Sequence, residues 1–276
     1  MSTNVPPSSI GRRILIGLVL GWFALLILVP TGAIAKEAFA DGIRPLIASL
    51  AKPEVLRAFR LTLITTACAT VANTVFGLAF AIVLVRQKFR GKTLVDGLVD
   101  LPFAISPVVT GLMLVVLYGP KGWFGRPLEA AGIQVAFAVP GMVLACMFVT
   151  LPFVVREVVP VLQEFGVDQE EVAYTLGASR WTTFWRVTLP SIRWGLAYGV
   201  TLTIARSLGE FGALLVVSGN TVNRTQTATL YVHEAIDSLD PRGAYAVSLI
   251  LAGTSFVLLI AMELVRKRVA EREGKS

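Results

Sequence analysis

The stretch that decides the fold reads Asp168-Gln-Glu-Glu-Val-Ala-Tyr-Thr-Leu-Gly-Ala178, a polar segment set between long apolar runs. Asp168 and Glu171 have the spacing of a capping box, in which an N-cap side chain and a carboxylate three residues later satisfy free backbone donors. Gly177 is placed to end this short helix in the left-handed conformation. Ser179 can cap a second short helix, which we expect to end at Pro190. A loop that only joined two membrane spans would need none of these signals.

The runs on either side are those of a membrane protein. Of the 276 residues, 55% are hydrophobic and 16% are charged, against about 25% charged in an average soluble domain. A helix needs about 20 apolar residues to cross the hydrocarbon core, and six runs allow this. They are 14–35, 61–85, 101–120, 130–155, 194–219 and 243–262. We therefore predict an all-α membrane protein with six transmembrane helices.

Lysine and arginine residues set the predicted orientation. With both termini in the cytoplasm, fifteen of the 25 fall in cytoplasmic segments and nine in outer loops, and Arg206 lies within a span. Cytoplasmic loops of membrane proteins carry the excess of positive charge. We therefore expect a cytoplasmic tail over 1–13, a six-helix domain over 14–265 with the loop 168–190 in the cytoplasm, and a cytoplasmic tail over 266–276.

Two features allow a competing interpretation. Arg12 and Arg13 precede an apolar run that ends Ala33-Ile34-Ala35, as a signal peptide with its cleavage site would. This run is longer than the usual hydrophobic segment of a signal peptide, so we expect an uncleaved first helix. The net charge of +7 could indicate nucleic acid, but positive cytoplasmic loops explain it, and no nucleic-acid partner is predicted.

The chain offers no chemistry of its own for driving transport. No GxxxxGK[ST] phosphate-binding loop occurs in it, so we expect it neither to bind nor to hydrolyse ATP, and we predict no cofactor or metal. His233, the single histidine, falls in a predicted outer loop. Energy for transport would then come from a partner or from an ion gradient.

Apolar side chains within the polar loop indicate a contact surface. They are Val172, Leu176, Trp181, Phe184 and Trp185. Exposed apolar patches usually mark a protein interface. The alternatives are that the loop folds back on its own helices, or that its tryptophans lie in the lipid headgroup layer.

The loop resembles the EAA loop of bacterial ABC-importer permeases, the element that docks on an ATP-hydrolysing subunit. The residues that fill the pattern are Glu171, Ala173, Gly177, Ala178, Val187, Leu189 and Pro190. Val172 departs from it by replacing the first alanine, which slightly lowers helix propensity and leaves the glycine turn intact. The resemblance implies a cytoplasmic coupling helix that transmits closure of the ATP-binding subunit to the membrane helices.

Further segments extend the resemblance to about residues 55–265. They are 100–109, 122–125, 137–141, 184–190 and 206–212. Together they are similar to sulfate/thiosulfate importer permeases of the CysW type, a class of binding-protein-dependent transport system inner-membrane components. The resemblance implies the type I importer architecture and inward transport of sulfate, and of thiosulfate, across the bacterial cytoplasmic membrane.

The same resemblance implies the partners. These are two ATP-binding subunits that hold the ATP and Mg, a second homologous permease that completes a heterodimer, an extracytoplasmic sulfate-binding protein, and the lipid bilayer. Permeases for molybdate or tungstate share part of the pattern and remain an alternative. A stand-alone secondary transporter or channel is the other alternative, and such a protein would not need a docking loop.

Arg206 and Glu210 are the charged residues of the fifth run. Each charge at mid-bilayer costs about 2.5–3.5 kcal/mol on insertion scales, and at i, i+4 spacing the two can neutralise each other on one helix face. The pair either locks this helix against its neighbours, or Arg206 attracts an oxyanion in the translocation path while Glu210 holds its side chain. Both interpretations stay open.

The third run holds a polar group whose role is also open. Ser106 lies between Pro102 and Pro107, and proline removes a backbone donor and kinks a membrane helix. A kink with a free carbonyl and a hydroxyl can line a substrate path, or it can serve packing alone. We interpret the glycines within the spans as close contacts between helices. They are Gly77, Gly111, Gly199 and Gly209.

Overall fold

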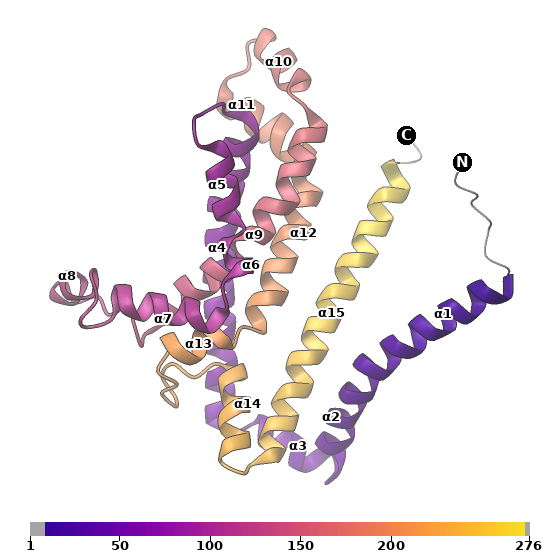
Figure 1. Cartoon of the computed structure of the whole chain (residues 1–276), viewed down its shortest axis with the longest axis vertical. Coiled ribbons are helices and arrows are strands. Elements are labelled where there is room, and N and C mark those ends of the chain that lie inside the picture. The colour runs from indigo at the N-terminus through magenta and orange to yellow at the C-terminus, as the bar shows by residue number, and fades with distance from the viewer. Residues whose placement is uncertain (1–8, 274–276) are drawn as a thin grey trace.

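The computed structural model describes residues 9–273, and all regular elements over these residues are helices. Figure 1 shows several long helices that run in roughly one direction, with short helices across them and at both ends. The elements are α1 (Ser9–Phe23), η1 (Ala24–Leu28), α2 (Val29–Phe39), α3 (Ile43–Leu50), α4 (Pro53–Arg86), α5 (Lys92–Val99), α6 (Leu101–Ala104), α7 (Pro107–Tyr118), α8 (Gly125–Ala130), α9 (Val139–Phe165), α10 (Asp168–Thr175), α11 (Arg180–Thr183), η2 (Phe184–Thr188), α12 (Leu189–Leu208), α13 (Gly212–Val217), α14 (Ala228–Asp237) and α15 (Pro241–Glu273).

Helix extends into both expected tails. α1 already begins at Ser9, and α15 continues to Glu273. The tails predicted over 1–13 and 266–276 are therefore partly helical, and residues 1–8 and 274–276 lie outside the described residues.

Four helices in the described part of the chain are long and apolar enough to cross a membrane. They are Gly11–Phe39, Pro53–Arg86, Val139–Phe165 and Pro241–Leu264, and they match the first, second, fourth and sixth apolar runs. α4 has 34 residues and is therefore about 51 Å long, well beyond the roughly 30 Å of a hydrocarbon core. One end of α4 must then extend outside the membrane.

The other two apolar runs are not continuous helices, which corrects the expectation for 101–120 and 194–219. The third run breaks at Ile105 and Ser106, which are extended, because the ring of Pro107 disfavours helical geometry in the residue before it. The fifth run breaks between the end of α12 at Leu208 and the start of α13 at Gly212. Figure 1 shows α7 and α13 lying across the direction of the long helices.

α9 lies at the centre of the packing and contacts α4, α12, α7 and α13. Neighbouring helices approach each other closely at three of the four glycines that the sequence indicated as contact points. A Cβ at Gly77 would come within 2.9 Å of Val154, and one at Gly199 also within 2.9 Å of it. A Cβ at Gly111 would lie only 2.5 Å from the carbonyl oxygen of Ala213. Gly209 is the exception, because it ends α12 and touches no other helix closely.

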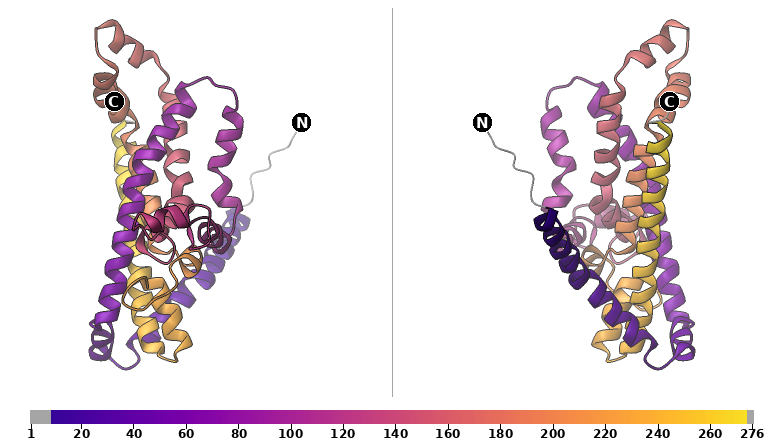
Figure 2. Two further views of the ribbon diagram at one scale, coloured as in Figure 1. Left: turned by 90° about the vertical axis from the view of Figure 1, so that its left-hand side faces the viewer. Right: turned by 90° about the vertical axis from the view of Figure 1, so that its right-hand side faces the viewer.

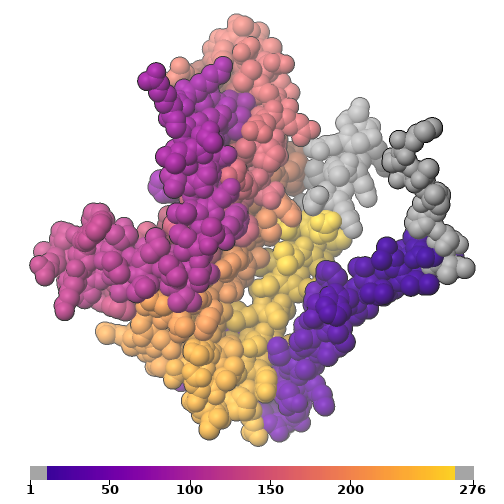
Figure 3. Space-filling view, in the orientation of Figure 1, coloured from indigo at the N-terminus to yellow at the C-terminus, as the bar shows by residue number. Residues whose placement is uncertain are grey.

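The first helix stands apart from the rest. α1, η1 and α2 form one continuous helix, and none of its most apolar window is buried. α2 contacts α15 and α3, while Figure 3 shows α1 separated from the body of the molecule. The segment 33–35, which resembled a cleavage site, lies inside α2.

Other short helices lie at the two ends of the molecule. Figure 2 shows from two sides that α10 projects beyond the long helices at one end, and Figure 1 places α3 and α14 at the opposite end. α15 runs from the α14 end toward the α10 end. α10, the first helix of the polar loop, therefore lies beyond the end of the long helices.

Candidate functional site

The polar loop folds as two short helices, α10 and α11, but the first cap differs from the prediction. The N-cap of α10 is Val167, whose carbonyl accepts from Glu171 N at 2.9 Å, and no side chain caps the helix. Asp168 is already the first helical residue, so the predicted capping box is wrong. Asp168, Glu170 and Glu171 instead place negative charge in the first turn, where the helix dipole favours it.

The glycine turn is confirmed. Gly177 has φ +83°, its N–H donates to Tyr174 O at 2.9 Å, and Ala178 N donates to Ala173 O at 3.0 Å. These two bonds are those of a Schellman motif. A Cβ at Gly177 would meet no atom within 4 Å, so the backbone conformation alone demands glycine here.

Ser179 caps α11, as predicted, by accepting from Thr182 N at 3.2 Å. The helix does not end at Pro190, which corrects the expected limit. It continues through the wider turn η2 into α12, where Pro190 lies in the first turn and needs no helical partner. Leu189 is half-buried against the cluster that contains Leu162, so this end of the loop is anchored in the bundle.

The loop presents apolar side chains to solvent. Leu176 is 83% and Trp181 is 70% exposed. Trp181 also forms an aromatic cluster with Phe184 and Trp185, with ring centroids 5.3–6.2 Å apart. The exposed apolar surface expected from the sequence is therefore present on the loop.

The acidic residues of α10 divide between two faces. Glu171, the acid of the EAA pattern, is exposed, while Ala173 and Ala178 are half-buried. Glu170 points inward: its Oε1 lies 3.1 Å from Arg86 Nη2 and accepts from Thr188 Oγ1 at 2.8 Å. Sequence reasoning missed this contact, because Arg86 is 84 residues away and no local spacing signals it.

The Arg206–Glu210 pair forms, with 2.7 Å between Nη1 and Oε2. It does not lie on one helix face, because α12 ends at Leu208 and Glu210 falls in the break. Glu210 is 1% exposed, while the side chain of Arg206 is 34% exposed. Glu210 Oε1 accepts from Ala213 N at 2.9 Å, so the carboxylate also holds the first turn of α13.

The breaks in the third and fifth runs lie beside each other. A Cβ on Gly212, the first residue of α13, would be 3.0 Å from Pro107 Cβ, the first residue of α7. Ser106 directly precedes α7 and is exposed, and Glu210 precedes α13 by two residues. The structure therefore brings two of the candidate path segments to one region.

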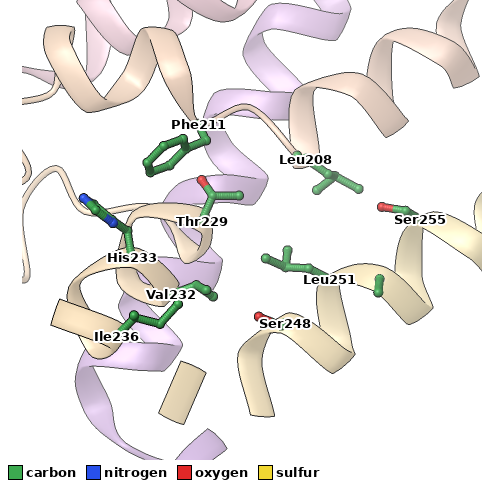
Figure 4. A pocket seen from close by; sticks show the side chains of 11 residues that line it. Leu208, Phe211, Thr229, Val232, His233, Ile236, Ser248, Leu251 and Ser255 are labelled. Carbon is green, nitrogen blue, oxygen red and sulfur yellow. The ribbon is translucent and has the colours of Figure 1, made fainter. Parts of the chain in front are cut away.

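A cavity of about 480 Å³ lies next to the fifth-run break, between α14 and α15. Figure 4 shows Phe211 and His233 on one wall and Leu251 of α15 on the other. Thr229, also on this wall, donates to Glu210 O at 2.7 Å. His233 is in helix α14 rather than in the predicted loop, with its ring 5.3 Å from that of Phe211. The lining is mostly apolar and suits an oxyanion poorly.

A third ionic group ties the third run to α9. Arg156 lies 2.6 Å from Asp100 and 2.9 Å from Asp96. Asp96 is in α5 and Asp100 directly precedes α6. The sequence did not predict these contacts, because each of the three residues taken alone is typical of a charged side chain in solvent.

The arrangement of long, broken and projecting helices is that of the membrane subunit of an ABC importer. A crystal structure of a bacterial ABC transporter involved in the import of the acidic polysaccharide alginate has the same fold, with a TM-score of 0.76 over 94% of this chain and 95% of that one, at 18% identity. The chain belongs to the family of binding-protein-dependent transport system inner membrane components, whose model matches residues 73–271.

Three relatives share nearly the whole chain. The sulfate transport system permease protein CysW of Synechococcus elongatus is 48% identical over 94% of this chain and 90% of the relative. That of Escherichia coli K12 is 40% identical over 98% and 93%. The sulfate transport system permease protein CysT of the same strain is 36% identical over 95% and 96%. The family resemblance predicted from the sequence is confirmed.

Proposed function

We propose that this chain is the permease subunit of an ATP-driven importer that carries sulfate, and also thiosulfate, inward across the bacterial cytoplasmic membrane. The observation that carries the proposal is the projecting loop 168–190, which presents an exposed apolar surface and the EAA residues at one end of an apolar bundle. The names of the relatives supply the substrate. An oxyanion channel that worked alone would have no use for such a surface.

We infer six crossings in total. The four long apolar helices supply four, and we assign the other two to the broken third and fifth runs, each completed by its flanking helices. Six crossings put both termini on the side of α10, which the excess of positive charge assigns to the cytoplasm. The architecture is then that of a type I importer with a cytoplasmic coupling helix, α10.

The loop is the proposed contact with the ATP-binding subunits, which would hold the ATP and Mg. The residues assigned to it are Glu171, Ala173, Gly177, Ala178, Leu189 and Pro190. The existence of two unlike sulfate permeases in Escherichia coli K12, both related to this chain over nearly its whole length, supports a heterodimer with a second permease. The family's description supports an extracytoplasmic binding protein, here one for sulfate.

The paired breaks are the proposed place on the translocation path. Arg206 offers a positive charge whose side chain is one-third exposed, Glu210 fixes that side chain, and the hydroxyl of Ser106 lies beside the start of α7. An arginine already paired with a carboxylate binds an oxyanion weakly. Weak binding suits a path that must release what passes.

Uptake of radioactive sulfate tests the function. The chain is reconstituted in proteoliposomes with its second permease, its ATP-binding subunits and its binding protein. We expect uptake that requires ATP and is inhibited by excess thiosulfate. Inhibition by molybdate or tungstate, with none by thiosulfate, would assign the chain to the related oxyanion instead. Uptake without ATP and without the partners would favour a stand-alone transporter.

Cysteine labelling in intact cells tests the topology. A membrane-impermeant thiol reagent should label a cysteine placed at Lys52 or at Arg224 and should miss one placed at Arg180. Labelling at Arg180 would overturn the orientation and, with it, the docking role of the loop.

A further inference from the structure

We propose that Arg86, Glu170 and Thr188 form a latch that fixes α10 to the membrane helices, so that movement of the loop is passed to α4, α9 and α12. The inference rests on the proposed docking of the loop. It assigns positioning residues that lie outside the EAA pattern and that do not face the docking partner.

The contacts of Arg86 join three elements. Arg86 is the last residue of α4, its Nη2 is 3.1 Å from Glu170 Oε1 in α10, and its Nη1 donates to Leu162 O in α9 at 3.3 Å. The carbonyl of Leu162 is among the last four of its helix, which have no partner within the helix. The guanidinium therefore bridges the ends of two long helices and the coupling helix.

Thr188 adds the fourth element. It is the last residue of η2, directly before α12, and its Oγ1 donates to the same Glu170 oxygen at 2.8 Å. One carboxylate oxygen of Glu170 thus contacts a residue at the end of α4 and a residue at the start of α12. α10 otherwise packs mainly against α11 and η2, so this oxygen is its polar connection to α4.

Burial distinguishes the latch from a surface ion pair. The side chains of Arg86 and Glu170 are only 14% and 12% exposed, and charges interact more strongly where water is excluded. Exposed ion pairs contribute little. The loop is therefore held to the helix ends at a defined place rather than by a mobile contact.

Glu170 and the next residue, Glu171, face different surroundings. Glu171 is exposed on the outer face of α10, while Glu170 is turned toward the bundle. Leu176, which caps the C-terminus of α10, and Trp181 of α11 are the most exposed apolar side chains of the loop. A substitution at Glu170 should then leave the docking surface in place and weaken only the attachment of α10 to the membrane helices.

The test measures sulfate taken up per ATP hydrolysed in proteoliposomes that contain the complete transporter. The variants are Glu170→Gln, and Thr188→Val, which leaves the ion pair intact. Glu164→Gln is the matched control, since Glu164 is an exposed carboxylate of α9 near the same end. Copurification of the ATP-binding subunit and the elution profile in detergent are recorded for every preparation.

We expect every variant to retain the ATP-binding subunit and to hydrolyse ATP. Sulfate moved per ATP should fall roughly tenfold in Glu170→Gln, within the usual range of coupling between linked sites, less in Thr188→Val, and not at all in Glu164→Gln. A wild-type ratio in well-assembled Glu170→Gln would overturn the latch. So would loss of the ATP-binding subunit from that variant alone, because the pair would then serve docking. Failure of the wild-type chain to retain the subunit would contradict the proposed function itself.

Discussion

The Arg86–Glu170 pair and the Arg206–Glu210 pair both place a carboxylate away from solvent, but they join different things. Arg206 and Glu210 are four residues apart and hold a single break together, with the carboxylate reaching on to the first turn of α13. Arg86 and Glu170 are 84 residues apart and connect the projecting loop to the ends of two long helices. The first pair shapes a local turn, and the second sets how two regions move relative to each other.

The two pairs also differ in how far their side chains are exposed. Glu210 is 1% exposed but its partner is 34% exposed, whereas both members of the loop pair are below 15%. The break therefore has a fully buried acid with a cation that is partly available to a passing anion. The loop pair has no such opening, which agrees with a purely mechanical role.

Removing Arg206 should have the largest effect. Arg206→Met leaves the buried carboxylate of Glu210 without its cation, and we expect a loss of up to about 3–5 kcal/mol in the free energy of unfolding. The measurement is the thermal unfolding and assembly yield of the detergent-purified complex. An unchanged yield would mean that Glu210 does not need Arg206.

The double variant Arg206→Met with Glu210→Gln sharpens this result. It removes both charges, so assembly should recover. If Arg206 lies on the translocation path, sulfate uptake measured on the same preparations should stay low. Normal uptake by a well-assembled double variant would leave the pair a structural role only.

Removing the cation of the loop pair should cost less. Arg86→Met leaves Glu170 with the hydroxyl of Thr188 and some access to water, and we expect a loss of about 1–3 kcal/mol, seen as a smaller fall in the unfolding temperature. A loss larger than that of Arg206→Met would reverse the ranking of the two pairs.

The turn of the loop should respond to backbone conformation rather than to space. Gly177→Val forces a β-branched residue to φ +83° at a cost of about 1–2 kcal/mol, and we expect sulfate uptake to be lost while the helices still insert. Gly177→Asn is the control, since asparagine adopts this conformation more readily. Equal uptake by the valine and asparagine variants would show that the turn is not needed.

The smallest effect should come from the exposed pair at the opposite end. Lys52 and Asp240 are 2.7 Å apart with side chains about 40% exposed. Their hydrogen bond lowers the pKa of Asp240 and raises that of Lys52. The stability gained from Asp240 is thus present above its unfolded pKa and lost as the pH falls through the folded pKa. That from Lys52 is present below its unfolded pKa and lost as the pH rises through the folded one.

Between these limits, unfolding should not respond to pH through this pair. Asp240→Asn should cost no more than about 1 kcal/mol at neutral pH, which thermal unfolding at low and high salt can measure. If Asp240→Asn lowered the free energy of unfolding as much as Arg86→Met, the solvent exposure of an ion pair would not predict its contribution to stability.

Sequence reasoning predicted what depends on neighbours along the chain. Four of the apolar runs are long helices, Gly177 ends α10, Ser179 caps α11, and Arg206 meets Glu210. Each follows from composition over one window or from spacing within one turn. The surface of the loop could be predicted for the same reason.

What the sequence left open depends on contacts between distant segments. Pro107 signalled a disturbance in the third run but not a full break, and the break after Leu208 rests on bonds from Ala213 and Thr229. Glu170 and Glu171 are adjacent and alike, and only the position of Arg86 decides which of them faces the bundle. The capping box failed because Asp168 joins the helix rather than preceding it.

The most direct measurement of the central claim is photo-cross-linking from the loop. A photoreactive amino acid replaces Leu176, 83% exposed at the α10 end, or Leu239, 87% exposed at the opposite end, in the complete transporter. We predict a cross-link to the ATP-binding subunit from position 176 and none from position 239. A cross-link from 239 alone, or the absence of any product with that subunit from 176, would contradict the role of this loop as its docking element.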